Sequence, residues 1–115
     1  AGKAALENTF FSSLYSPDDT SDLNKEFVAE YKKAYNTNPD VFAALAYDST
    51  LLVAKAIEDA GSADPAKIAE AMAKIKGFKG VSGEVTFNEE HNPIKSAVII
   101  EHKDGKQTFK TKVNP

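Results

Sequence analysis

The sequence has 115 residues, which is enough for one domain or for part of a larger one. Its 14 basic and 17 acidic side chains argue against nucleic-acid binding, because a protein that follows phosphates needs a basic surplus. Cysteine is absent, which excludes disulfides, thiolate catalysis and thiolate metal sites. No apolar run approaches the roughly 20 residues of a membrane-spanning helix, and no signal peptide is recognisable, so we expect any leader to have been removed or to lie upstream.

The first part of the chain is predicted to contain a strand and three helices. Residues 7–15 are rich in aromatic and hydroxyl side chains and predict a strand that leads into a loop. The first helix begins after Ser21 as its N-cap, and its apolar side chains recur at helical spacing on one face. The second helix spans 40–60 and ends before Gly61, and the third begins at Asp64-Pro65, a cap followed by a proline in the first helical position.

The last part of the chain is predicted to form three strands. Residues 84–87 alternate between polar and apolar side chains, and the middle of 96–102 is expected to be buried on both faces. Asp104-Gly105 is typical of a two-residue hairpin turn. The lysine-bearing segment 107–113 suits an exposed edge strand. The expected order is therefore β-α-α-α-β-β-β, which places the chain in the α/β class.

The start of the second helix is unusual because residues 41–47 are apolar on nearly every side. Such a helix is normally buried on every side, so a core helix is the simplest interpretation. Alternatively, Phe42 in its first turn faces a ligand cleft, since small-molecule sites combine apolar walls with a few polar groups. The N–H groups of the same turn would then suit a carboxylate.

No catalytic constellation is apparent in the sequence. Ser82 lies in a turn that lacks the spacing of a nucleophile elbow. The acidic pairs Asp18-Asp19 and Glu89-Glu90 are interpreted as solvated loops, because no apolar surroundings would raise their pKa values for acid–base work. His91 follows the second pair, but the spacing of the two histidines fits no metal-ligand pattern. We therefore expect no enzyme activity, no cofactor and no metal.

Six short motifs follow one another along nearly the whole chain. They are ENTFFSSLYSPDD at 7–19, FVAEY at 27–31, NP at 38–39 leading to AYD at 46–48, AI at 56–57 with AGS at 60–62, FKGVSGEVTF at 78–87 and KDGK at 103–106. Each motif alone is weak, but together and in this order they are specific. The chain resembles the C-terminal portion of the type I periplasmic solute-binding proteins, in the branched-chain amino acid (Leu/Ile/Val) group that serves ABC transporters.

The resemblance implies that residues 1–115 are a C-terminal fragment of a two-lobed α/β fold whose lobes close on a ligand about a hinge. Residues 18–90 would belong mainly to the first lobe. The strands at 8–15 and 96–113 would reach toward the hinge and the second lobe. A chain of this length is too short for two lobes, so we expect it to carry only part of the site and to leave apolar faces that favour self-association of the fragment.

The resemblance also implies a function, the non-catalytic binding of a small amino acid-like solute. An exported, periplasmic or extracytoplasmic protein of this kind would deliver the solute to an ABC permease. Phe42 would pack on the side chain of the solute, whereas Tyr47 and Asp48 match the motif and either bind the solute or hold the helix in place. Three alternatives stay open: a ligand-sensing domain of a receptor or regulator, a small hydrolase or metal enzyme that uses Ser82 or the cluster at 89–91, and a structural interaction module.

Overall fold

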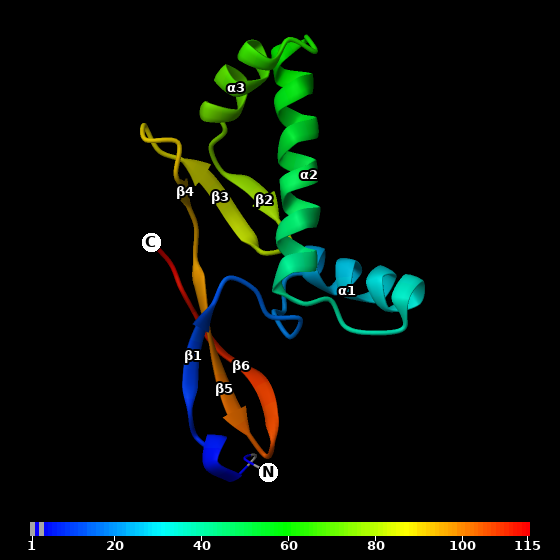
Figure 1. The fold of residues 1–115 in the computed structure, drawn as a ribbon, viewed down its shortest axis with the longest axis vertical. Coiled ribbons are helices and arrows are strands. Elements are labelled where there is room, and N and C mark those ends of the chain that lie inside the picture. Colours follow the sequence, from blue (N-terminus) through cyan, green and yellow to red (C-terminus); the bar gives the residue numbers. More distant parts are fainter. Residues whose placement is uncertain (1, 3) are drawn as a thin grey trace.

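The computed structural model describes residues 2 and 4–115. In that part of the chain, a short 3-10 turn (Ala4–Leu6) precedes three α-helices and six strands. They are β1 (Phe10–Ser13), α1 (Asp22–Tyr35), α2 (Val41–Ala60), α3 (Pro65–Ala73), β2 (Phe78–Gly80), β3 (Gly83–Phe87), β4 (Pro93–Ile94), β5 (Ala97–Lys103) and β6 (Lys106–Val113). The molecule is elongated, with extents of 53 × 33 × 25 Å (Figure 1). The helices with β2, β3 and β4, here called the helical unit, lie toward one end, and the sheet β1-β5-β6, here called the outer sheet, lies at the other.

Each α-helix begins at a side chain that caps it. Ser21, Asp40 and Asp64 are extended and accept hydrogen bonds from first-turn N–H groups of α1, α2 and α3, which have no partner within the helix. Gly61 ends α2 in the left-handed conformation, with φ of 56°. The predicted starts of the three helices are confirmed. None of the helices among the described residues combines the length and the apolar character that a bilayer-spanning helix needs.

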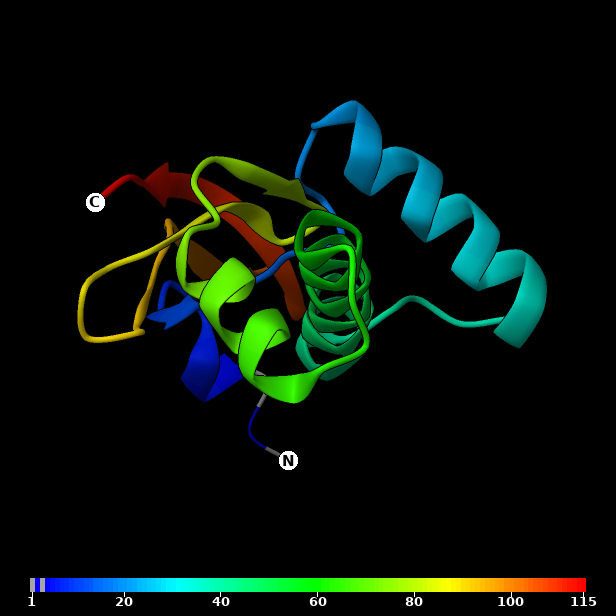
Figure 2. The same cartoon turned by 90° about the horizontal axis from the view of Figure 1, so that it is seen from above.

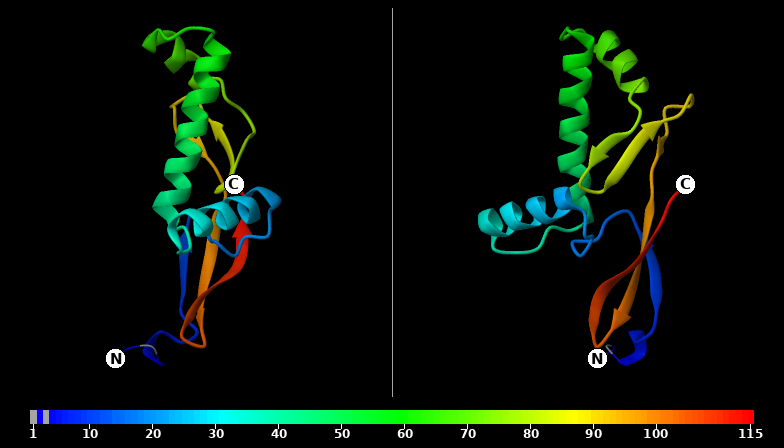
Figure 3. Two further views of the ribbon diagram at one scale, coloured as in Figure 1. Left: turned by 90° about the vertical axis from the view of Figure 1, so that its right-hand side faces the viewer. Right: turned by 180° about the vertical axis from the view of Figure 1, so that it is seen from behind.

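The core of the helical unit lies between α2, α3 and the β2–β3 hairpin. Leu52 and Ala56 of α2 are buried against Ile75 and Val85, and Met72 of α3 packs on this cluster. The buried positions of α2 recur every four residues and therefore share one face of the helix. The views in Figure 3 show the hairpin beside α2 and α3 folded back along it.

The outer sheet is antiparallel throughout, with β5 between β1 and β6. Val98 and Ile100 of β5 are buried, whereas the alternate residues Ala97, Ile99 and Glu101 are half-buried, so burial on both faces is less complete than predicted. The predicted hairpin turn is confirmed, since Asp104 and Gly105 have φ of 52° and 71°. Strand β6 lies at the edge of the sheet, as its lysines predict.

Two short strands, β2 and β4, were not predicted. β2 pairs with β3 in the register Phe78↔Val85 and Gly80↔Gly83, and β4 contributes two residues on the other side of β3. Strands of two or three residues are too short for a period to be visible in the sequence. The predicted order is otherwise confirmed, and the fold is α/β.

The first turns of α2 are not buried on every side, which corrects the prediction. Ala44 is fully buried, but Phe42 and Tyr47 are 76% and 45% exposed, and Val53 farther along the helix is exposed as well. The reason is that α3 and the β2–β3 hairpin cover α2 from one side, while α1 contacts it only near Phe27 and Tyr47. Figure 2, which looks nearly along α2, shows α3 and the β2–β3 hairpin on the same side of the helix. Apolar surface therefore remains uncovered in the part of the chain that the structure describes.

Neighbouring leucines of α2 should differ sharply in their contribution to stability. Leu52 is 9% exposed and Leu51 is 40% exposed. We expect Leu52→Ala to lower the free energy of unfolding by about 2–5 kcal/mol, because it leaves a cavity in the core. Leu51→Ala is the matched control and should cost about 0.5 kcal/mol or less. Urea unfolding followed by circular dichroism measures both, and equal losses would contradict the assignment of the core.

Candidate functional site

Phe42 lies in the first turn of α2, two residues after the Asp40 N-cap. With 76% of its surface accessible, it is the most exposed large apolar side chain of the described residues. The Asp40 carboxylate already accepts a hydrogen bond from the N–H of Ala43 at 2.8 Å, so this first-turn donor is not left for a ligand. An uncovered phenyl ring at a helix start is available to an apolar ligand group.

Tyr47 lies on another side of α2, in an aromatic groove between α1 and α2. Its ring centroid is 4.8 Å from that of Phe27, and Tyr31 and Tyr35 continue the row of rings along α1. The groove has a volume of about 830 Å³, and Phe42 is not among the residues that line it. Phe42 and Tyr47 are therefore parts of two different surfaces.

Helical geometry keeps the three predicted site residues apart. At 3.6 residues per turn, the side chains of Phe42, Tyr47 and Asp48 point about 100–140° from one another. The Phe42 side chain is exposed to solvent, Tyr47 lines the groove, and Asp48 points into the molecule and is 3% exposed. One small ligand cannot contact all three, and the ligand-binding role of each stays a prediction.

Asp48 fastens α2 to the turn between β2 and β3. Its carboxylate accepts hydrogen bonds from the N–H groups of Val81 at 2.8 Å and Ser82 at 2.9 Å, and from the Ser82 hydroxyl at 2.5 Å. A Cβ atom on Gly80 would lie only 2.5–2.7 Å from the carboxyl atoms of Asp48, so a glycine is needed for this approach. The geometry thus favours the second of the two roles considered for Asp48, that of holding the helix in place.

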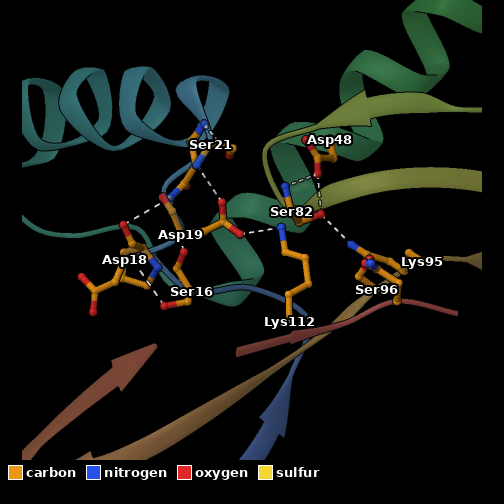
Figure 4. A network of polar contacts seen from close by, with 12 residues as sticks. Ser16, Asp18, Asp19, Ser21, Asp48, Ser82, Lys95, Ser96 and Lys112 are labelled. Atoms are coloured by element: carbon orange, nitrogen blue, oxygen red, sulfur yellow. Dashed lines mark hydrogen bonds and ion pairs between the residues drawn. The ribbon is translucent and has the colours of Figure 1, made fainter. Parts of the chain in front are cut away.

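Lys95, between β4 and β5, extends this contact toward the outer sheet. Its ammonium donates a hydrogen bond to Ser82 Oγ at 2.6 Å (Figure 4). Burial lowers the pKa of Lys95 below its usual value, although the charge of Asp48 acts in the opposite direction. A serine beside a lysine is also an arrangement that nucleophilic enzymes use. Here, however, Ser82 is 7% exposed and its hydroxyl donates a hydrogen bond to the buried carboxylate of Asp48, which favours a structural role.

Asp19 is not the solvated loop residue that the sequence predicted. Its side chain is 12% exposed and forms an ion pair with Lys112 of β6 at 2.6 Å, and it also accepts a hydrogen bond from the N–H of Ser21 at 2.9 Å. Burial acts to raise the pKa of Asp19, but the hydrogen bonds from Lys112 and Ser21 outweigh it, so the pKa lies below its usual value. No local signal in the sequence could identify Lys112 as its partner, because the two residues are brought together only by the return of β6.

The acidic cluster at 89–91 is solvated, as predicted. Glu89, Glu90 and His91 are all exposed. Within residues 2 and 4–115, no group of three His, Cys, Asp or Glu side chains is placed to hold a metal ion.

The close approach of Gly80 to Asp48 can be tested by a double-mutant cycle. We expect Gly80→Ala to lower the free energy of unfolding by about 1–3 kcal/mol, because the added methyl group overlaps the carboxylate. The same substitution in an Asp48→Ala background should cost much less, since the obstructing atoms are gone. Urea unfolding of the four chains measures the coupling, and an equal cost in both backgrounds would show that the clash is not the cause.

Comparison with known proteins places this arrangement in a family. Residues 1–107 match the family model described as periplasmic binding protein. The Leu/Ile/Val-binding protein homolog 1 of Brucella suis is 30% identical over 90 residues, which are 77% of this chain and 24% of that protein. The leucine-, isoleucine-, valine-, threonine-, and alanine-binding protein of Pseudomonas aeruginosa is 39% identical over 67 residues, which are 57% of this chain and 17% of that protein.

Solved structures of solute-binding proteins are also similar to this chain. The leucine-binding protein LivK from Thermotoga maritima superposes with a TM-score of 0.86 at 38% identity, over 96% of this chain and 32% of that one. LivJ from Streptococcus pneumoniae, in complex with isoleucine, superposes with a TM-score of 0.83 at 37% identity, over 95% of this chain and 31% of that one. A solute-binding protein from R. palustris, in complex with benzoate, superposes with a TM-score of 0.80 at 26% identity, over 100% of this chain and 33% of that one.

The chain thus spans about a quarter to a third of the length of the first relatives and structures that it matches. The six motifs, the family match over residues 1–107 and the superposition with leucine- and isoleucine-binding proteins agree with one another. Members of this family are non-catalytic solute-binding proteins of ABC transporters, which confirms the expectation drawn from the absence of a catalytic constellation. The chain belongs to the periplasmic binding protein family, and it is similar to members of that family that are named for binding leucine, isoleucine and valine.

Proposed function

We propose that this chain is the C-terminal part of a binding protein that captures a small solute outside the cytoplasm and hands it to an ABC permease. The observation that carries the proposal is the superposition of 96% of the chain on a leucine-binding protein at 38% identity. The exposed Phe42 at the start of α2 supports it, because a purely structural core helix would bury this ring. In such a protein the output is a change of conformation, since the ligand favours the closed form.

The two parts of the molecule suggest how it contributes to a two-lobed protein. We assign residues 18–90 to the first lobe, because they contain the three α-helices and both hydrophobic clusters apart from Tyr15. The strands at 8–15 and 96–113 would lead toward the hinge and the second lobe. Their separation from the helices along the long axis of the molecule supports this division (Figure 3).

The proposed ligand is a small carboxylate with an apolar body, such as a branched-chain amino acid. Similar structures contain isoleucine, Leu or benzoate, and these solutes share a carboxylate and an apolar group. Phe42 would pack on the apolar group. The groups that bind the carboxylate and the ammonium would come mostly from outside these 115 residues, so this chain carries only part of the site.

Removing the Phe42 ring should weaken ligand binding by the full-length protein that contains this segment. A ligand present at 100 times its Kd adds about 2.7 kcal/mol of stability, which a thermal-shift measurement detects. We expect Phe42→Ala to remove about 1.5–3 kcal/mol of binding free energy for leucine, because a buried phenyl contact is lost. Tyr35→Ala, which removes another exposed ring at 67% exposure, is the control and should leave the shift unchanged. Equal shifts in Phe42→Ala and the parent would place the ligand elsewhere.

We also propose that the 115-residue chain by itself associates with a second copy. The aromatic groove and the exposed Phe42, Leu51, Val53 and Ile57 leave α2 with apolar surface that water disfavours. Sedimentation velocity should therefore show species larger than the 12.4 kDa chain as concentration rises. Val53→Glu should shift the chain toward monomer, whereas Ile94→Glu, which alters an equally exposed residue on β4, should not. A parent chain that stays monomeric at every concentration would refute self-association.

A further inference from the structure

The outer sheet is attached to the helical unit by only two stretches of chain. Residues 14–21 join β1 to α1, and residues 95–96 join β4 to β5. The two hydrophobic clusters of buried residues that the described part of the chain contains include no residue of β1, β5 or β6. Val98 and Ile100 of β5 are buried but belong to neither cluster, whereas Tyr15 in the first linker packs on Ala44 and Val81. In these clusters, only a linker residue lies next to the sheet, and polar contacts beside the two linkers become the candidates for fixing how the sheet is oriented.

The first polar contact joins strand β6 to the start of α1. Lys112 reaches from the sheet to Asp19, and the ion pair is mostly shielded from water, with side-chain exposures of 34% and 12%. The loop that carries Asp19 is itself held by Asn24, which is fully buried. The amide of Asn24 donates to the carbonyl oxygens of Ser16, Pro17 and Asp19 at 3.4, 3.2 and 2.8 Å. Lys112 thus binds a rigid anchor on the helical unit.

The second polar contact joins the linker before β5 to α2. Lys95 donates to Ser82 Oγ, and Ser82 donates in turn to the carboxylate of Asp48. Both lysines extend from the sheet side toward the helical unit, and the two contacts lie close together (Figure 4). Lys112 and Lys95 are near enough for the charge of Lys112 to disfavour protonation of Lys95. The two cations therefore act on the same junction.

We propose that the Asp19–Lys112 ion pair and the Lys95–Ser82–Asp48 relay form a polar clamp that holds the outer sheet in one orientation against the helical unit. Without the ion pair, the sheet would be free to pivot where β1 enters the anchored loop and at residues 95–96. The clamp is a property of this chain without ligand, so it stands or falls independently of the solute-binding function.

Spin-label distance measurements on the 115-residue chain test the clamp. The sequence has no cysteine, so Glu58→Cys on α2 and Lys106→Cys on β6 give a uniquely labelled pair across the junction. Both positions are exposed, and dilution with unlabelled chain restricts the signal to distances within one molecule. In the parent we expect one narrow distance distribution. In Lys112→Met we expect the distribution to broaden and its mean to shift by several ångströms.

Strand β6 itself supplies the matched control. Lys110 lies two residues before Lys112, and its ion pair with Glu101 at 3.0 Å stays within the outer sheet. Lys110→Met removes the same charge from the same strand and should keep the narrow distribution. Lys112→Arg, which preserves the positive charge, should keep it as well.

A second variant distinguishes loss of the ion pair from loss of folding. Asp19→Asn keeps the shape of the anchor and removes its charge, and far-UV circular dichroism reports whether the helices of each variant remain. Broadening in Lys112→Met or Asp19→Asn with intact helices, and not in Lys110→Met, would support the clamp. Distributions that are the same in the parent and in both clamp variants would overturn it, as would equal broadening in Lys110→Met.

Discussion

The arrangement of the helical unit depends on one buried carboxylate. A charged group that is 3% exposed is tolerated only if hydrogen bonds replace the water that it loses, and Asp48 receives three of them from Val81 and Ser82. Those donors belong to the turn between β2 and β3, so satisfying the charge also fixes where the hairpin meets α2. Gly80 allows the approach because it has no side chain. With the hairpin in this position, Val85 packs with Leu52 and Ala56 in the apolar core.

The two ends of the molecule are held together by different forces. Within the helical unit, apolar side chains pack between α2, α3 and β3. Between the helical unit and the outer sheet, the contacts that we identify are an ion pair and a hydrogen-bond relay. Polar contacts have preferred directions and apolar packing does not, so a polar junction can set an orientation without a large buried area.

The uncovered face of α2 connects the fold with the proposed function. The helix is apolar on more sides than α1, α3 and the β2–β3 hairpin cover, which leaves Phe42, Val53 and Ile57 exposed. Structures that match this chain are about three times as long, and in our proposal a larger protein uses such surfaces for the ligand and for the rest of its first lobe. The same surface is the physical basis of the proposed self-association when the chain is alone.

The sequence by itself determined the local features of this protein. Ser21, Asp40 and Asp64 defined the helix starts, and Asp104-Gly105 defined the hairpin, because caps and turns depend on residues that are close together in the chain. Motif order was also enough to identify the family.

The tertiary structure decided which side chains meet. Phe42, Tyr47 and Asp48 are close together in the sequence and were all candidates for ligand binding, yet the helix directs these residues to three different surroundings. Asp19 and Lys112 form an ion pair across most of the length of the chain, and neither pattern nor spacing could predict it, since such contacts exist only after long segments have packed. The burial of α2 was overestimated for the same reason, because composition shows that a face is apolar but not whether another element covers it.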